Sequence, residues 1–270
     1  GFTLGADGTS NYPSGNSFVA WVWRAGGPAV ANTDGDVTSQ VSANTDYGFS
    51  IVTWTNPSSG SGAFTVGHGL GAAPSLIFVK PRSNTGNWNT FHSSISTDTS
   101  KYLNLNTADG TQTYSGLWGS ALPTSSVFGL GNNFRDGYTM VAYCWSEVSG
   151  YSKISGYAGT GANGNKQTTG FKPRWVIIKG TDSTYDWQIF DSERSPSDPR
   201  NKILAANTSD AEATSGNNIN FLDDGFDFNT TSDKLNGSNK NYIYAAFADR
   251  PGNNWDVNNI VTNEGLTTSK

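Results

Sequence analysis

The stretch that decides the fold reads APSLIFVK at residues 73–80 and NWNTFHS at residues 87–93. It recurs as KPRWVIIK at residues 172–179 and DWQIFDS at residues 186–192. Four pairs of identical residues keep one constant separation: Pro74 and Pro173, Lys80 and Lys179, Trp88 and Trp187, Phe91 and Phe190. A period of about one hundred residues is too long for a solenoid and has the size of a small domain. The sequence therefore predicts two copies of one domain.

A shorter phrase closes each copy and also occurs near the start of the chain. It reads VAYCW at residues 141–145, IYAAF at residues 243–247 and VAWVW at residues 19–23. The opening residues therefore have the shape of the last third of a module, which either belongs to a preceding copy or completes a sheet with the first full copy. We expect them to form strands that pair with another sheet, because a lone hairpin is barely stable in water.

Short runs of alternating apolar and polar residues fill both copies. They are rich in β-branched and aromatic types and end in Gly, Asn, Asp or Pro, which is typical of strands in a sandwich or barrel. No helical pattern stands out. We predict an all-β fold of two tandem antiparallel β-sandwich modules of a jelly-roll-like kind. In the first copy the expected strands are 48–55, 63–67, 75–81, 87–92, 102–106, 126–130 and 138–147.

The predicted organisation has five parts. Residues 1–25 are terminal strands of a partial module, residues 26–46 a linker, residues 47–149 and 150–250 the two sandwiches, and residues 251–270 a tail. Val37, Ser39 and Val41 alternate with polar residues in the linker, so this segment can add an edge strand.

Composition restricts the partners. The formal net charge is −5, and the seventeen Lys and Arg residues are scattered. A nucleic acid or an anionic membrane surface needs a basic patch, so neither is an expected partner. No apolar stretch reaches the roughly eighteen residues of a membrane span, so no membrane insertion is expected. Cys144 is the only cysteine, which excludes an internal disulfide. Val22 and Ala246 occupy its place in the other closing phrases, so we expect a small buried hydrophobe.

Several short patterns resemble those of nucleotide-binding or hydrolytic sites, but the residues around them do not fit such sites. Residues 159–164 read GTGANG, the letters of a dinucleotide loop, but another strand follows where that site needs a helix. His68 lies in a Gly-rich turn and His92 follows Phe91, and we expect a surface or a turn role for each. A glycosidase needs two facing carboxylates, and a virion depolymerase on that basis is the weaker alternative to a non-enzyme. The candidate acidic clusters are Asp34 with Asp36, Asp191 with Glu193, and Asp223 with Asp224 and Asp227.

Calcium binding at Asp34-Gly35-Asp36 is a further alternative, but no acidic residue follows at the twelfth position of an EF-hand loop. We therefore predict no catalytic residue, no metal site and no cofactor.

The aromatic residues fall into two groups. Those shared by the copies, such as Trp88 with Trp187 and Phe91 with Phe190, are interpreted as core residues. Those without a counterpart lie in or beside predicted loops, where they suit a subunit interface, loop packing or stacking on sugar rings. These candidate ligand or interface residues are Tyr114, Trp118, Phe134, Tyr185 and Trp255.

Four longer phrases carry a family resemblance: FTVGHGLGAAPSLIFVK at 64–80, YLNLNT at 102–107, VAYCWSEVSGY at 141–151 and NTSDAEATSGNNINF at 207–221. They resemble the repeated all-β domain of virion appendage proteins in cyanophages and other marine tailed phages, from Phe2 to about Asp249. The resemblance implies a structural or adhesive role in the phage particle, for example in a tail fibre that spaces or presents a host-binding surface. It carries over no catalytic or ligand-binding residue.

The same resemblance implies the partners. Tail fibres are commonly threefold, so we expect a homo-oligomer, a trimer, in contact with other virion proteins. Two alternatives remain open: a lectin-like module that binds host cell-surface glycans directly, and a capsid decoration protein.

Overall fold

The computed structural model describes residues 3–4, 17–134 and 136–249. The regular secondary structure of these residues is almost entirely antiparallel strand, with one short 3-10 helix, η1 (Asn132–Phe134), which confirms the predicted all-β class. The part of the chain so described contains no helix long and apolar enough to cross a membrane. Both repeats belong to one compact unit that begins at Arg24.

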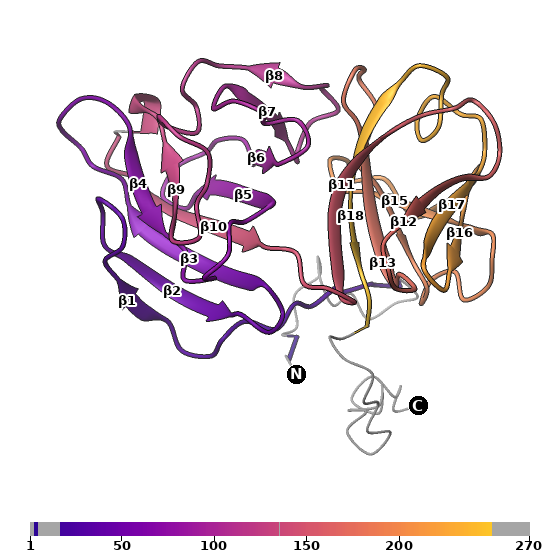
Figure 1. Ribbon diagram of the computed structural model, residues 1–270, viewed down its shortest axis with the longest axis horizontal. Coiled ribbons are helices and arrows are strands. Elements are labelled where there is room, and N and C mark those ends of the chain that lie inside the picture. The colour runs from indigo at the N-terminus through magenta and orange to yellow at the C-terminus, as the bar shows by residue number, and fades with distance from the viewer. Residues whose placement is uncertain (1–2, 5–16, 135, 250–270) are drawn as a thin grey trace. The chain divides into compact units, whose positions relative to one another are not determined.

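The first repeat is built on one eight-stranded sheet and a separate two-stranded ribbon (Figure 1). In spatial order the sheet contains β1 (Val30–Asn32), β2 (Ser39–Asn44), β3 (Phe49–Thr55), β10 (Thr139–Trp145), β5 (Leu76–Pro81), β6 (Asn89–His92), β7 (Lys101–Asn104) and β8 (Gln112–Thr113). The ribbon pairs β4 (Phe64–Gly67) with β9 (Val127–Leu130). All seven strands expected in this copy are formed, within about two residues at each end.

The core of the first repeat lies between the sheet and the ribbon. Val52 on β3 and Ile77 on β5 are fully buried against Phe128 of the ribbon, because alternate residues of a strand point to one face. Trp54 makes an edge-to-face contact with Phe128, with ring centroids 5.7 Å apart. Cys144 is also fully buried in this core, as the sequence predicted. This is the two-layer packing of a β-sandwich.

The second repeat forms one curled sheet of eight strands. In spatial order these are β11 (Ser152–Ala158), β18 (Asn241–Phe247), β13 (Trp175–Gly180), β14 (Gln188–Asp191), β15 (Arg200–Ala205), β16 (Ala213–Leu222), β17 (Gly225–Asn229) and β12 (Asn165–Thr168). The two end strands approach each other where Asn165 Nδ2 donates to Ala158 O at 3.0 Å. The sheet is therefore a nearly closed barrel.

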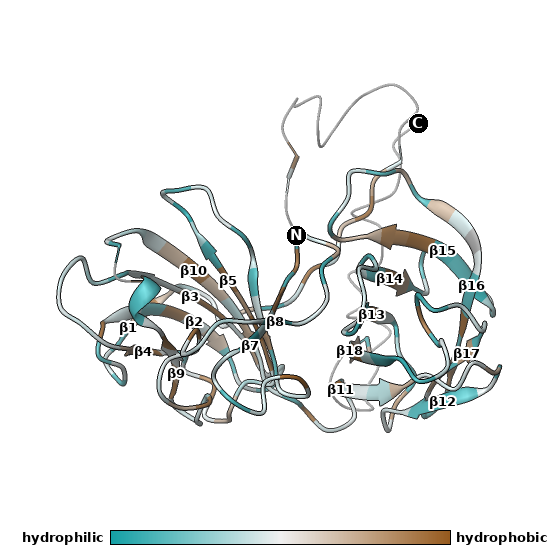
Figure 2. Cartoon of the chain, turned by 90° about the horizontal axis from the view of Figure 1, so that it is seen from above, coloured by the Kyte–Doolittle hydropathy of each residue, from teal (hydrophilic) through white to brown (hydrophobic). Residues whose placement is uncertain are grey.

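The length of one strand explains why the repeats differ from the two identical sandwiches that we predicted. β16 has ten residues and pairs with both β15 and β17, whereas its counterpart β8 has two residues and pairs only with β7. The long strand joins the two layers into one sheet. It also supplies Ile219 and Phe221 to the core, so β12 can be polar where β4 is apolar (Figure 2).

Six strands of each sheet nevertheless follow the same order in the two repeats. The order β3-β10-β5-β6-β7-β8 corresponds to β11-β18-β13-β14-β15-β16, and the β4–β9 pair corresponds to β12–β17. Trp88 directly precedes β6 and Trp187 directly precedes β14. The Asn106 side chain accepts a hydrogen bond from Trp88 N at 2.8 Å, and the Asn207 side chain accepts one from Trp187 N at 2.9 Å. The repeat thus extends to individual hydrogen bonds.

The start of the chain differs from expectation. Residues 17–25 form no strand, although strands were expected across residues 1–25. The position beside β3 is taken instead by β2, which comes from the expected linker and buries Ser39 and Val41. β1 pairs with β2 in turn and forms that end of the sheet. Residues 1–2, 5–16 and the expected tail, 251–270, lie outside the described part.

Replacing Ile77 by Ala should lower the free energy of unfolding by about 2–5 kcal/mol, because the side chain is fully buried and its loss leaves a cavity. Val30→Ala is the matched control: Val30 is 66% exposed, so its loss should change stability by less than about 0.5 kcal/mol. Chemical denaturation followed by tryptophan fluorescence measures both. Equal effects of the two substitutions would contradict the assignment of this core.

Candidate functional site

The two repeats meet at a buried contact, here called the repeat junction. It joins the segment 92–111 of the first repeat to the outer face of β13, β14 and β18 in the second. Ile177, Ile243 and Ala245 on that outer face lie outside the core cluster of the second repeat and are still buried. Gly156 on β11 lies so close to the first repeat that a Cβ there would be 3.1 Å from the Cβ of Ser94.

Lys179 is the most unusual side chain at the repeat junction, since lysine is rarely buried without partners. It is fully buried, and its ammonium donates to three carbonyl oxygens: Ala108 O at 3.1 Å, Gly180 O at 2.7 Å and Ser183 O at 3.4 Å. Burial lowers the pKa of Lys179 to about 8, opposed by the negative charges of Asp186 and Asp109. All three donors of the ammonium group are thereby used.

Trp187 provides the second connection. Its Nε1 donates to Asn104 O at 3.0 Å, in a position buried from solvent. Next to it, Thr111 N donates to Thr181 O at 2.8 Å. A donor or acceptor that is buried from solvent without a hydrogen bond is costly. These hydrogen bonds therefore fix the position of one repeat against the other.

His92 provides the third connection. Of the surface and turn roles that the sequence left open for it, the surface role is wrong. It is 1% exposed, and its Nε2 lies 3.2 Å from Tyr244 O on β18. Its Nδ1 accepts a hydrogen bond from Ser94 N at 3.2 Å, so the ring proton sits on Nε2 and is donated to the carbonyl. Burial lowers the pKa of His92 to about 4. The ring is therefore neutral at physiological pH.

His68 is also buried rather than at the surface, at 0% exposure. Its Nδ1 accepts from Leu70 N and its Nε2 lies 3.1 Å from Thr124 O, so it stabilises a turn from within. Burial lowers the pKa of His68. The turn role expected for His68 is therefore supported, whereas a surface role is wrong for both histidines, because a Gly-rich turn in the sequence says nothing about what later folds over it.

A cleft of about 490 Å³ opens beside the repeat junction. Its polar side chains include Ser94 from the first repeat and Ser155, Asp182 and Asn241 from the second. Asp182 is held in place by Asn241, whose N and Nδ2 both donate to Oδ2, at 2.8 and 3.0 Å. Such groups suit the hydroxyls of a carbohydrate. Asp182 is the one carboxylate among the described lining residues, whereas glycoside hydrolysis ordinarily uses two.

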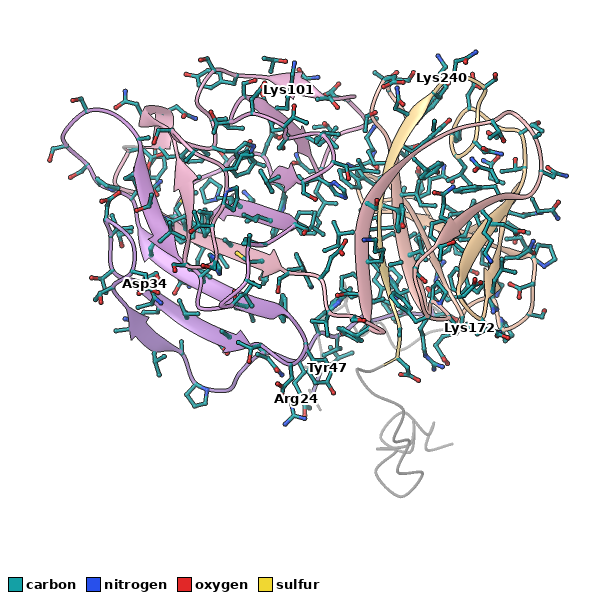
Figure 3. All side chains as sticks on the ribbon, viewed as in Figure 1. Arg24, Asp34, Tyr47, Lys101, Lys172 and Lys240 are labelled. Carbon is teal, nitrogen blue, oxygen red and sulfur yellow. The ribbon has the colours of Figure 1, made fainter. Side chains whose placement is uncertain are left out.

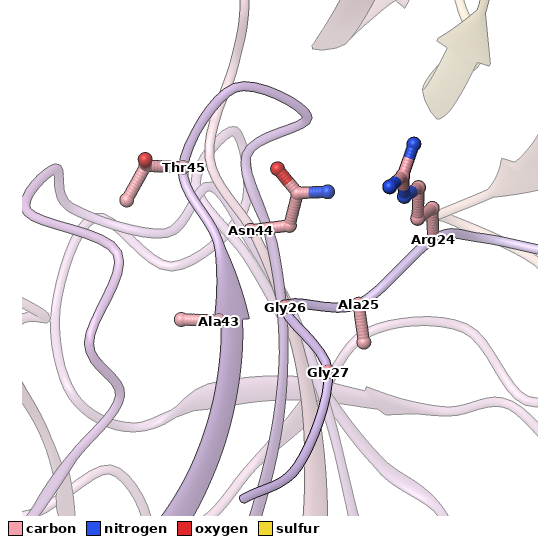
Figure 4. Close-up of a pocket in the computed structure, with 7 residues that line it drawn as sticks. All are labelled: Arg24, Ala25, Gly26, Gly27, Ala43, Asn44 and Thr45. Atoms are coloured by element: carbon pink, nitrogen blue, oxygen red, sulfur yellow. The ribbon is translucent and has the colours of Figure 1, made fainter. Parts of the chain in front are cut away.

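A second pocket, of about 400 Å³, lies beside β2 (Figure 4). Arg24 and Asn44 project on the same side of it, and the rest of the lining comes from small residues. The guanidinium can bind a carboxylate or a hydroxyl-bearing ligand. No second charged side chain lines this pocket among the described residues, so it offers recognition without acid–base chemistry.

The five candidate aromatics do not form one site. Tyr114 is 51% exposed and Tyr185 is half-buried, with its hydroxyl 3.4 Å from Asp233 Oδ2. Trp118 and Phe134 are 1% and 6% exposed and belong to the core of the first repeat, where Trp118 Nε1 donates to Lys101 O. These two therefore cannot contact a ligand or a subunit. Trp255 lies outside the described residues.

The acidic clusters serve the structure of turns and sheets. Asp36 Oδ2 accepts from Thr65 N and Thr65 Oγ1, and Asp191 pairs with Arg194 at 2.6 Å. Charged groups such as Asp34, Lys101 and Lys172 lie at the surface (Figure 3). Within the described ranges no group of three or more His, Cys, Asp or Glu could hold a metal ion. The GTGANG loop joins β11 to β12 and is followed by no helix.

Sequence reasoning missed the repeat junction, although a signal for it was present. Lys179 and Trp187 are two of the residues that match between copies, and they were assigned to the fold alone. Their partners, Asn104 O and Ala108 O, are backbone groups that no side-chain pattern can reveal. The interpretation of the matched tryptophans as core residues was wrong: Trp187 is buried at the repeat junction, and its counterpart Trp88 is half-exposed.

Acidification should destabilise the protein through His92. Its pKa is about 4 when folded, against an ordinary value of 6.5, so the unfolded state binds more protons between these pH values. The free energy of unfolding should therefore fall as the pH is lowered through this window, by on the order of 3 kcal/mol. Denaturation of the unmutated chain and of His92→Gln at pH 7, 5 and 4 measures the difference. Equal pH slopes in both proteins would contradict the prediction.

Comparison with known proteins gives a family and no relative. Comparison with curated proteins yields no significant match, and comparison with solved structures yields none either. A family described as "Domain of unknown function (DUF7483)" matches residues 1–251. Because this range covers most of the chain, the protein belongs to the DUF7483 family.

Proposed function

We propose that the chain is a structural and adhesive module of a tailed-phage virion, in a tail fibre or similar appendage that spaces or presents a host-binding surface. The observation that carries the proposal is the repeat junction. A spacer must keep a fixed distance and direction, and here Lys179, Trp187 and His92 join two repeats through buried hydrogen bonds. An ordinary flexible linker between domains would not do this.

Two further observations support the proposal. Charged residues make up only 14% of the chain. Uncharged residues such as Asn, Ser, Thr and Gly are abundant instead, as on proteins that face salt and carbohydrate outside the cell. The phrases quoted above resemble repeated domains of phage appendages. On this proposal the partners are other virion proteins and further copies of the chain, as a homotrimer.

The cleft beside the repeat junction favours a second candidate, a lectin-like module. Its Ser, Asn and Asp side chains resemble the groups that orient sugar hydroxyls, and the half-buried Ile95 provides apolar surface next to them. Host cell-surface glycan would then be the partner.

Antibodies raised against the chain should label fibres or other appendages of intact particles in electron micrographs. Label on the capsid surface would contradict the proposal and favour a decoration protein. If intact particles carry no label at all, both the appendage proposal and the decoration-protein alternative are contradicted. Particles of a phage that lacks the gene provide the control for antibody specificity.

A glycan array separates the spacer from the lectin. The spacer proposal predicts no binding by the unmutated chain. If a glycan binds in the cleft, Asn241→Ala should weaken binding about tenfold, as expected for the loss of one well-placed hydrogen bond. The matched control is Asn44→Ala, in the pocket beside β2.

A further inference from the structure

The repeated Lys–Trp pair has a specific task in the second repeat. Lys179 donates to Ala108 O and Trp187 Nε1 donates to Asn104 O, and both acceptors belong to the first repeat. The pair therefore joins one repeat to the repeat before it. Contact between repeats therefore explains why the Lys–Trp pair occurs in both copies. Packing within the core of a single repeat does not explain it.

In the first repeat the same pair is not used in this way. Lys80 on β5 donates to Gly86 O, within its own hairpin, at 2.9 Å. The Trp88 side chain makes no hydrogen bond within the described residues, and both side chains are half-exposed. Within the described residues, neither of these two side chains therefore makes a hydrogen bond to another repeat.

The residues around this pair also contrast with their counterparts. Phe78 and Tyr143 are half-exposed, and Tyr143 lies parallel to Trp88 with ring centroids 6.1 Å apart. Ile177 and Ala245 occupy the matching positions of the second repeat and are buried. We call the outward side chains of Phe78, Lys80, Trp88 and Tyr143 the Lys80–Trp88 face. Its aromatic surface is typical of protein interfaces.

The complementary surface is present at the other end of the unit. The phrase that carries Asn104 and Ala108 recurs in the second repeat, where Ala205 and Ser209 stand in their places. Ala205 is half-buried and Ser209 is exposed. Asp109, whose charge raises the pKa of Lys179, has its counterpart in the exposed Asp210. The charge of this segment therefore complements Lys80.

We propose that the Lys80–Trp88 face of one copy binds residues 205–210 of a second copy, so that the repeat junction within the chain is reproduced between chains. The larger Tyr143 and Phe78 side chains make this contact shallower than the internal one and more dependent on aromatic packing. A head-to-tail contact of this kind closes into a ring if its rotation allows, and a rotation of about 120° gives a trimer. The inference does not depend on a location in the virion.

Two variants test the proposal, one on each side of the contact. The double variant Lys80→Met, Trp88→Phe removes both donors and keeps the apolar bulk of the face. Ser209→Trp places a bulky side chain on the complementary segment. Each should weaken self-association at least about tenfold in sedimentation at micromolar concentration. Tyr114→Ala, an exposed aromatic elsewhere on the first repeat, is the matched control and should assemble like the unmutated chain.

Mixing the two variants gives the sharpest result. Each retains one intact side of the contact, so an equimolar mixture should form dimers that grow no further. Circular dichroism confirms that each variant is folded, and Lys80→Met alone replaces the double variant if that one is not. The proposal is overturned if the unmutated chain stays monomeric, if either variant assembles normally, or if the mixture stays monomeric.

Discussion

A buried ammonium group needs hydrogen-bond acceptors on every side, and this requirement determines how the two repeats of this chain meet. Lys179 finds one carbonyl in its own strand, one in the following turn and one in the first repeat. If the first repeat moved away, Ala108 O would be lost and water would have to enter beside β13. The cost of an unsatisfied charge in a covered position is several kcal/mol. The rest of the repeat junction, including Trp187 and His92, is arranged around this constraint.

The two repeats show how one strand order can give two architectures. Six strands of each sheet follow the same order, yet the first repeat is a sandwich and the second a nearly closed barrel, because β16 is long and β8 is short. The longer strand places Ile219 and Phe221 in the core and frees β12 to be polar. A change in the length of a single strand is thus enough to join or separate the layers, while the hydrogen bonds that cap Trp88 and Trp187 stay the same.

The sequence predicts what depends on local periodicity. Alternation of apolar and polar residues, as around Val52 and Ile77, predicts the seven strands of the first repeat. The matched Lys and Trp residues predict that the domain occurs twice. The sequence does not predict what covers a turn or the outer face of a sheet. The sequence left a surface or a turn role open for His68 and His92, and an interface, loop packing or sugar contact open for Trp118, which has no counterpart in the other copy. In each case burial comes from a segment distant in sequence, and for His92 from the other repeat. The repeat junction was missed because its acceptors are backbone carbonyls.

The path of the chain has a mechanical consequence. Each repeat begins and ends on neighbouring antiparallel strands, with Phe49 opposite Trp145 and Ser152 opposite Phe247. The chain therefore enters and leaves a repeat at the same corner of its sheet. Tension applied through these two ends peels the strands apart one hydrogen-bonded pair at a time instead of shearing all pairs together. A repeat of this design is weak when pulled through its own termini, so load has to be carried by contacts between repeat surfaces. The same geometry lets a repeat be duplicated or removed without altering the course of the chain on either side.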